Sequence, residues 1–283
     1  TVELPLWFVV LAGILAAAGL FDRLLNPAFQ WYLRSRANRA IDELNSRLRL
    51  KIRPFKMTTR QVLIDRLAND PQVVSAAEAH ARETGMPVAA ALADADRYAR
   101  EIVPAFSAYT YFTIGARLAR WVSTSLYRVR LAFTDRGLLE KLDTDATVVF
   151  VMNHRSNMDY ILVTYMASTA TALSYAVGEW ARIPVLQMLI RSMGAYFIRR
   201  SSRSGLYRKV LARYVQMATQ AGVTQAMFPE GGLSRDGKLR PVKLGLISYM
   251  VEGFDPAGRD VLFIPVGLNY DRVLEDRSLV AEI

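Results

Sequence analysis

The sequence of 283 residues contains no cysteine and only two histidines. The absence of cysteine excludes disulfides, cysteine nucleophiles and thiolate metal sites, and it fits a reducing compartment. The two histidines, His80 and His154, lie far apart in the chain, so a histidine-rich zinc site is not expected. We therefore predict no metal site.

Acidic residues are also in short supply, with 26 Asp and Glu against 36 Lys and Arg, so the net charge is +10. This balance favours a polyanionic partner such as nucleic acid, anionic lipid or a phosphate-bearing metabolite. The basic residues are spread along the chain without stacking aromatics, and no nucleic-acid motif stands out, so we expect no nucleic-acid partner. Hydrophobic residues make up 52%, which predicts a substantial core and argues against general disorder.

Residues 4–21 carry no charge and reach the minimum length for crossing a bilayer. Trp7 near one end and Trp31 beyond the other resemble interfacial anchors. A signal peptide and a buried core helix are the alternatives, but a signal peptide carries positive charge before its apolar run, and here only Glu3 precedes it. The sequence therefore predicts a transmembrane or membrane-inserted helix within residues 1–25.

A series of basic residues follows this segment. They are Arg23, Arg34, Arg36, Arg39, Arg47, Arg49, Lys51 and Arg53. Positive charges that follow a membrane helix keep the rest of the chain on the cytoplasmic side, so we predict a membrane location with the catalytic part facing the cytoplasm. We expect a basic, helical, membrane-proximal region at residues 26–145, beginning with a helix that Pro54 ends.

Short helices are expected up to about residue 103. Breaks at residues 70–71 and 85–87, each containing proline, separate them. Thr58 with Gln61 three residues later resembles a capping box. We interpret His80, on one of these helices, as a surface or packing residue.

The segment 102–131 combines apolar and aromatic residues with arginines at helical spacing. Such a stripe belongs more often to a core than to a ligand site. Aromatic residues among arginines also suit the headgroup layer of a membrane. We expect this segment to be partly core and partly interfacial.

Residues 146–283 show a different pattern, in which strand-like runs alternate with helical ones. The expected strands are 147–152, 172–177, 195–198, 224–228 and 261–270, and the expected helices between them are 157–170, 184–193, 206–221 and 243–253. This alternation predicts an α/β domain with a mostly parallel sheet flanked by helices.

Polar residues including His154 and Asp159 follow the first expected strand, and strand ends are where α/β proteins place their chemistry. A neutral imidazole can take a proton from a hydroxyl, and a carboxylate on its other nitrogen fixes the tautomer. Side chains five residues apart lie about 140° apart on a regular helix, so this pair meets only if the chain turns between them. Alternatively, Asp159 satisfies backbone amides at a helix start.

Two further clusters carry candidate binding residues. Arg199 and Arg200 end the third expected strand, where one side chain faces the site and the other faces solvent. A guanidinium can bind two phosphate oxygens at once, although a solvated or headgroup-facing basic loop is an alternative. After the fourth strand, the turn at residues 230–232 allows close approach of a ligand and brings Ser234 and Arg235 near it.

In this order, four blocks resemble the motifs of the glycerol-3-phosphate acyltransferase family within the glycerolipid acyltransferases. The blocks are His154 with Asp159, Gly194 with Phe197 to Arg200, Phe228 to Gly232 with Ser234 and Arg235, and Ile264 to Tyr270. The resemblance covers about residues 147–275. The chain departs from it at Leu233, where the family usually has a basic residue.

The resemblance implies transfer of a fatty acyl group from acyl-CoA or acyl carrier protein to the sn-1 hydroxyl of glycerol 3-phosphate. The product would be lysophosphatidate, in the first step of phospholipid synthesis. The implied roles are general base for His154, its orientation for Asp159, phosphate binding for Arg200, Arg235 and Arg199, glycerol positioning for Glu230 and Ser234, and close backbone approach for Gly231. Asn153 and nearby amides would polarise the thioester. No metal, cofactor or acyl-enzyme is implied, and the partners are the two substrates and a phospholipid membrane.

Two other functions remain open. A lysophosphatidate acyltransferase would use the same base on another acceptor, although the Phe-Ile-Arg-Arg form of the second block favours glycerol 3-phosphate. A non-enzymatic basic membrane-binding module would explain the charge and the apolar segment, but not His154 or the turn after Glu230. Because the sequence starts at Thr1 rather than at a methionine, we also expect it to be part of a longer protein.

Overall fold

The computed structural model describes residues 41–131, 143–178, 184–199 and 204–275. The chain divides into two compact units, residues 1–48 and 49–283. In the first unit, the described residues form a helix at 41–47. The membrane helix predicted at residues 1–25 lies outside the described residues. Within the described ranges, no helix combines the length and the apolar character needed to cross a membrane.

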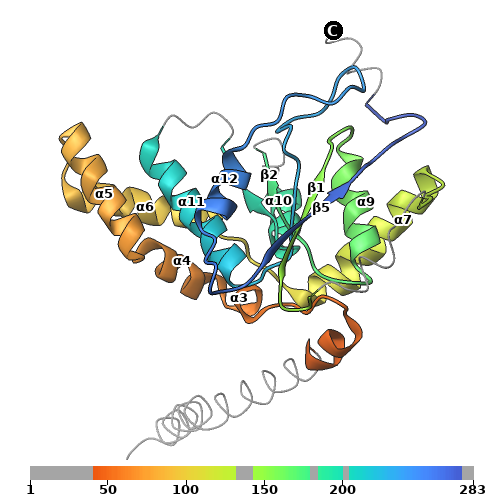
Figure 1. Cartoon of the computed structure of the whole chain (residues 1–283), viewed down its shortest axis with the longest axis horizontal. Coiled ribbons are helices and arrows are strands. Elements are labelled where there is room, and N and C mark those ends of the chain that lie inside the picture. Colours follow the sequence, from red (N-terminus) through yellow and green to blue (C-terminus); the bar gives the residue numbers. More distant parts are fainter. Residues whose placement is uncertain (1–40, 132–142, 179–183, 200–203, 276–283) are drawn as a thin grey trace, which may run out of the picture. The chain divides into compact units, whose positions relative to one another are not determined.

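A sheet of five parallel strands forms the centre of the second unit, in the order β3-β2-β4-β1-β5 (Figure 1). The strands are β1 Thr147–Met152, β2 Ser174–Val177, β3 Tyr196–Phe197, β4 Gln225–Met227 and β5 Val261–Val266. The α/β fold with a parallel sheet is thereby confirmed. Strand β1 has the predicted bounds because its run of β-branched residues is buried between β4 and β5, and the other strands are shorter than expected.

Helices cover both faces of this sheet. The helices are α3 Pro54–Met57, α4 Arg60–Ala68, α5 Pro71–Thr84, α6 Val88–Ile102, α7 Ala116–Leu126, α9 Met158–Ala167, α10 Pro184–Ser192, α11 Gly205–Gln220 and α12 Gly245–Glu252, with a π-helix η2 at Thr110–Gly115. In Figure 1, α4, α5, α6, α11 and α12 lie on one side of the sheet, and α7 and α9 lie on the other.

The side chains of β1 alternate between two hydrophobic cores. Val149 and Val151 pack with α4, α5, α6 and α11, whereas Phe150 and Met152 pack with residues of α9 and α10. This alternation is the period of two that a strand imposes on its side chains. Residues 60–103 therefore share one core with the sheet, and the histidine that follows β1 emerges on the α9 side.

Helix α5 begins and ends at the breaks that the sequence predicts. The Asp70 side chain accepts a hydrogen bond from the Gln72 amide at 3.0 Å, and Pro71 occupies the first helical position. Gly85 then ends the helix with φ of 71°, a left-handed conformation that glycine adopts without strain. Several short helices before residue 103 are thereby confirmed.

Two local predictions before this helix are wrong. Pro54 begins the short helix α3 instead of ending a longer one, because a proline at the first helical position loses no hydrogen bond. The expected capping box at Thr58 is also not formed. Helix α4 begins at Arg60, and the Thr58 hydroxyl donates to the Pro54 carbonyl while the Gln61 amide donates to Asp65.

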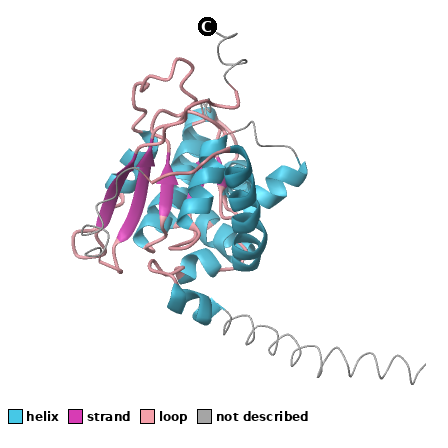
Figure 2. Ribbon diagram, turned by 90° about the vertical axis from the view of Figure 1, so that its right-hand side faces the viewer, coloured by secondary structure: helices cyan, strands magenta, loops and turns pink. Residues whose placement is uncertain are grey.

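The carboxyl ends of β1, β4 and β5 lie side by side because these three strands are neighbours (Figure 2). Strand β5 ends at Val266 rather than at the predicted Tyr270. The cause is Asn153, whose amide oxygen accepts from the Leu268 amide at 2.6 Å and whose Nδ2 donates to the Leu268 carbonyl at 2.8 Å. A side chain thus replaces the strand ladder, and the loop after β5 bends over the end of β1.

Candidate active site

His154 and Asp159 lie in direct contact at the end of β1. The distance between Nδ1 of His154 and Oδ2 of Asp159 is 2.8 Å, and both side chains are buried. The contact forms because residues 153–156 leave the strand as a loop and Asp159 lies in the first turn of α9. The turn on which the predicted pair depends is therefore present.

Asp159 also accepts hydrogen bonds from the backbone, so both interpretations of this residue describe part of its environment. Its Oδ2 accepts from the amides of Arg155 and Ser156 at 2.7 and 3.1 Å, and its Oδ1 accepts from the Tyr270 hydroxyl at 2.6 Å. Because the Asp159 carboxylate only accepts hydrogen bonds, Nδ1 of His154 carries the proton and donates a hydrogen bond to Oδ2. The other ring nitrogen, Nε2, is then the one that can accept a proton.

Tyr270 completes this arrangement from the loop after β5. Burial first and the neighbouring Asp159 carboxylate second raise the pKa of Tyr270 well above its ordinary value. The hydroxyl therefore stays protonated at neutral pH and donates to Asp159. Tyr270 belongs to the fourth sequence block, which implied no role for it, and its position at the end of the expected strand 261–270 was the only signal.

Aromatic rings hold the imidazole in place. The ring of Phe228 stacks on His154 with a centroid distance of 4.2 Å, and Tyr160 meets the imidazole edge to face at 5.3 Å. These rings come from the end of β4 and from α9. The imidazole orientation is thus fixed by packing as well as by its hydrogen bond to Asp159.

Glu230, the acidic residue of the third block, ties the loop after β4 to the loop after β1. Its Oε1 accepts from the His154 amide at 3.3 Å, and its Oε2 accepts from the Arg240 amide at 3.2 Å. The residue is only 4% exposed. The structure thus brings Glu230 to the histidine with both carboxylate oxygens engaged by the backbone.

Ser234 and Gly231 lie in the same loop. The Ser234 amide donates to the His154 carbonyl at 2.8 Å, and its hydroxyl donates to the Lys238 carbonyl at 2.6 Å. Gly231 has φ of 64°, and a side chain there would lie 3.0 Å from Cδ of Lys243. This position therefore requires glycine for its conformation and for the close approach of Lys243.

The loop between β1 and α9 is anchored by a second residue that the sequence did not reveal. Glu275 accepts from the Ser156 hydroxyl at 2.7 Å and from the Asn157 amide at 2.9 Å. Asn153 also binds within the protein, through its contacts with Leu268. Loops after three neighbouring strands thus converge on His154.

Arg199 forms its contacts away from the loops that converge on His154. Its guanidinium forms a bidentate ion pair with Glu101, with a shortest distance of 2.6 Å, and lies 5.4 and 5.3 Å from the ring centroids of Tyr98 and Tyr207. The Glu101 carboxylate is the main cause that raises the pKa of Arg199. Arg200 lies outside the described residues.

The loop after β4 carries several basic side chains. Arg235, Lys238, Arg240 and Lys243 are exposed there, and the Arg155 guanidinium lies 3.5 Å from where a side chain on Gly237 would be. Arg155 belongs to the loop that carries His154. Positive charge next to the histidine favours an anionic substrate.

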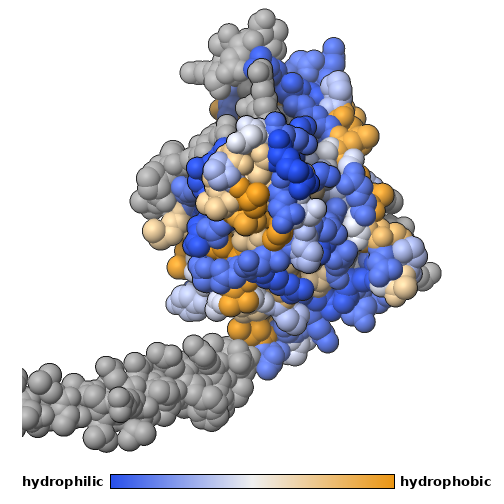
Figure 3. All heavy atoms as spheres, turned by 90° about the vertical axis from the view of Figure 1, so that its left-hand side faces the viewer, coloured by the Kyte–Doolittle hydropathy of each residue, from blue (hydrophilic) through white to orange (hydrophobic). Residues whose placement is uncertain are grey.

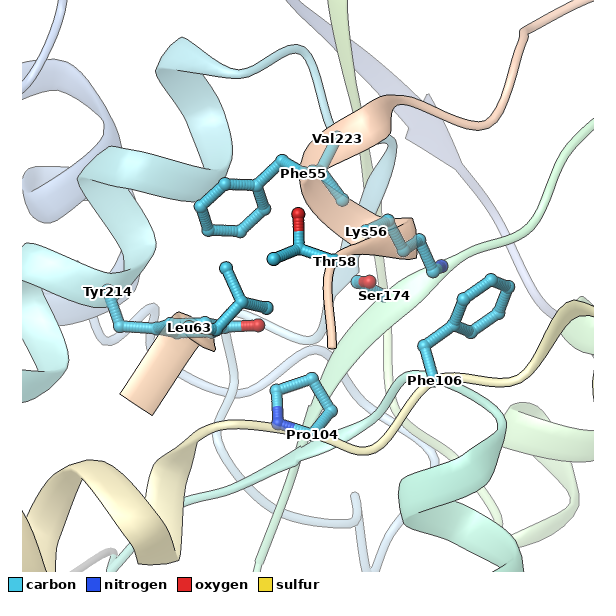
Figure 4. A pocket seen from close by; sticks show the side chains of 9 residues that line it. All are labelled: Phe55, Lys56, Thr58, Leu63, Pro104, Phe106, Ser174, Tyr214 and Val223. Atoms are coloured by element: carbon cyan, nitrogen blue, oxygen red, sulfur yellow. The ribbon is translucent and has the colours of Figure 1, made fainter. Parts of the chain in front are cut away.

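Lys56 is a buried basic residue that contacts the segment after α6 and the segment before β2. Its Nζ donates to the Ala172 carbonyl at 2.7 Å and lies 4.5 Å from the Phe106 ring centroid, toward which it extends in Figure 4. Burial lowers the pKa of Lys56 well below its ordinary value. The adjoining cavity, lined also by Thr58 and Ser174, measures about 10 Å³, about the space of one water molecule.

Comparison with known proteins connects this geometry to a family. Residues 132–269 match the family described as Acyltransferase. The chain is 30% identical over 231 residues to a glycerol-3-phosphate acyltransferase of Pseudomonas putida (strain KT2440). The aligned region covers 79% of this chain and 27% of the relative. A protein of the same name from Xylella fastidiosa (strain M23) is also 30% identical over 231 residues, with 80% and 26% covered. The chain thus spans about a quarter of the length of these relatives.

A distant structural similarity accompanies these matches. The crystal structure of the 1-acyl-sn-glycerophosphate (LPA) acyltransferase, PlsC, from Thermotoga maritima is similar over 67% of this chain and 78% of that chain, with a TM-score of 0.38 and 19% identity. The family match spans β1 to β5 and the loops after β1 and β4, so residues 132–269 form an acyltransferase domain.

Proposed function

We propose that this chain transfers a fatty acyl group from acyl-CoA or acyl carrier protein to the sn-1 hydroxyl of glycerol 3-phosphate. The observation that carries the proposal is the buried contact between His154 and Asp159, within a domain of the acyltransferase family. The names of the relatives support the acceptor. The basic side chains around the loop after β4 supply the positive charge that a phosphate requires.

In the proposed reaction, Nε2 of His154 takes the proton of the acceptor hydroxyl as its oxygen attacks the thioester carbonyl. Asp159 stabilises the imidazolium that forms. The carbon–sulfur bond then breaks, and the imidazolium returns its proton to the departing thiolate. The products are an ester and a free thiol, so the protein ends the cycle unchanged.

Several groups at the site have roles that follow from their contacts. Glu230 holds the histidine loop against the loop after β4 through two backbone amides. We propose Arg235 and Arg200 as phosphate ligands from the sequence motifs that contain them. Because the bidentate pair with Glu101 occupies the Arg199 guanidinium, we propose that Arg199 contributes little to phosphate binding.

A competition assay tests the acceptor. The full chain receives an acyl-CoA with a radiolabelled acyl group, together with unlabelled glycerol 3-phosphate and lysophosphatidate at equal concentrations, and the labelled products are separated. We expect lysophosphatidate as the main product. Preferential formation of phosphatidate would instead identify a lysophosphatidate acyltransferase, and absence of both products would support the non-enzymatic alternative.

His154→Ala tests the base, with the other histidine as a matched control. His80 lies half-buried on α5, away from the loops after β1, β4 and β5. We expect His154→Ala to lose acyl transfer by roughly a thousandfold or more and to keep its circular dichroism spectrum. His80→Ala should keep both acyl transfer and the circular dichroism spectrum. Near wild-type turnover of His154→Ala would overturn the mechanism.

A further inference from the structure

Helix α7 exposes large apolar side chains on one side. Trp121 and Leu118 of α7 are 66% and 44% exposed, and Ile114 of the preceding helix η2 is 48% exposed. Their spacing of three and four residues places them on the same side of the helix. Ala119 and Ser123 are buried on the other side, where α7 packs against α9. Helix α7 is thus packed on one side and apolar on the side that faces solvent.

The charge of this surface has one sign. Residues 102–131 contain no aspartate or glutamate. The four basic residues of the segment, all of them exposed, are Arg117, Arg120, Arg128 and Arg130. Arginines beside an exposed tryptophan and leucine match an anionic headgroup layer, in which each basic residue strengthens binding roughly fivefold. A neutral or cationic partner would gain nothing from these charges.

The end of α7 lies next to the candidate active site. Tyr127 directly follows the helix, and its ring lies 5.3 Å from that of Tyr270. The Tyr270 hydroxyl in turn donates to Asp159. A groove of about 500 Å³ opens at the same place, lined by residues 124–129 and by Tyr165 of α9. The exposed side of α7 therefore leads from solvent to the residues that hold the catalytic histidine.

We propose that the exposed side of η2 and α7 lies on the surface of an anionic lipid bilayer. This proposal rests on the proposed function, since it gives a long-chain acyl substrate and a lipid product a path between the bilayer and His154. Trp121 and Leu118 enter the headgroup layer, and the arginines contact lipid phosphates. The groove at residues 124–129 then opens at the membrane surface.

The face that carries α4, α5 and α6 offers a comparison within the same molecule. Figure 3 shows this side as mainly hydrophilic, with hydrophobic side chains in separate patches. Val62 of α4 is exposed by 53%, close to the exposure of Leu118. It lies on the opposite side of the sheet from α7, so it serves as a control position with similar exposure.

Because the chain contains no cysteine, a single introduced cysteine gives one site for an environment-sensitive dye. The full chain is labelled with nitrobenzoxadiazole at Leu118→Cys or at Val62→Cys. It is then mixed, without substrate, with vesicles of phosphatidylcholine alone or of equal parts phosphatidylcholine and phosphatidylglycerol. Both variants carry the same apolar segment at residues 4–21, so a difference between the labels reports on α7.

We expect the label at position 118 to shift to the blue and brighten severalfold with anionic vesicles only, and to return to its aqueous spectrum in high salt. The label at position 62 should not change. An unchanged spectrum at position 118, or the same response at both positions, would overturn the proposal. A shift without vesicles that grows with protein concentration would identify a second copy of the chain as the occupant instead.

Charge variants separate attraction to lipid from general effects. In the Leu118→Cys background, Arg117→Gln with Arg120→Gln should release the label at lower salt concentration than the parent. The control pair Arg66→Gln with Lys209→Gln, exposed on α4 and α11, should not. Transfer from a short-chain, water-soluble acyl-CoA without vesicles should be equal in all of them. Loss of that transfer in every variant would count against the proposed function and leave the label result standing.

Discussion

Replacing Asp159 by asparagine removes a charge from the site while its shape is kept. The amide oxygen can take the place of Oδ2 and accept from Nδ1 of His154 and from the amides of Arg155 and Ser156. The new NH2 group then faces the Tyr270 hydroxyl, which can rotate and accept. Four hydrogen bonds thus persist but lose their charge assistance.

The expected losses differ between folding and chemistry. Hydrogen bonds to a charged group exceed neutral ones by about 1 kcal/mol each, but a buried neutral amide costs less desolvation. We therefore expect Asp159→Asn to lower the free energy of unfolding by about 2 kcal/mol. Acyl transfer should fall roughly a thousandfold or more, because the imidazolium formed during transfer loses its counter-charge. Urea unfolding and the kcat for acyl transfer measure the two effects.

Two variants serve as controls for this substitution. Glu275→Gln makes the same chemical change on a carboxylate that binds Ser156 and Asn157 but not the histidine, so its turnover should stay within about threefold of wild type. Tyr270→Phe removes only the bond to Oδ1 and should lower turnover by about tenfold. If Asp159→Asn kept near wild-type turnover, or if Glu275→Gln lost as much, the role of Asp159 would be refuted.

Three further predictions concern basic residues. Arg199→Met should lower the free energy of unfolding by about 1 kcal/mol, the upper range for a partly exposed ion pair, with little change in the KM for glycerol 3-phosphate. Arg235→Met should raise that KM, and an unchanged KM would show that Arg235 does not bind the phosphate. Because burial lowers the pKa of Lys56, the unfolded chain binds a proton that the folded chain lacks, so stability should rise with pH toward the ordinary pKa of 10.5. Lys56→Met should flatten this rise in urea unfolding between about pH 7 and about pH 10, and an unchanged slope would show that the lysine does not contribute.

The sequence was most informative where local chemistry decides the structure. The β-branched run of β1, the helix break at Asp70 and Gly85, and the turn after His154 each depend on neighbouring residues. Prediction failed at Pro54, where proline is compatible with either end of a helical segment, and only the surrounding packing determines which end it occupies.

The candidate site was predictable only in its local part. His154 and Asp159 are five residues apart and could be paired by considering one loop. Tyr270 and Glu275 reach the same loop across more than a hundred residues, and no spacing rule connects them to it. The pairing of Arg199 with Glu101 was equally hidden, because it depends on how α6 packs beside β3.

The separation of these partners along the chain has a consequence for folding. The bond from Tyr270 to Asp159 spans 111 residues, and that from Asn157 to Glu275 spans 118. Contacts between such distant residues form late, because long loops must close first. During synthesis, His154 emerges well before β5, so the hydrogen bonds that support it form only after β5 has joined the sheet. Enzymatic turnover would therefore report on completed folding, and a nascent chain without β5 would carry an incomplete site.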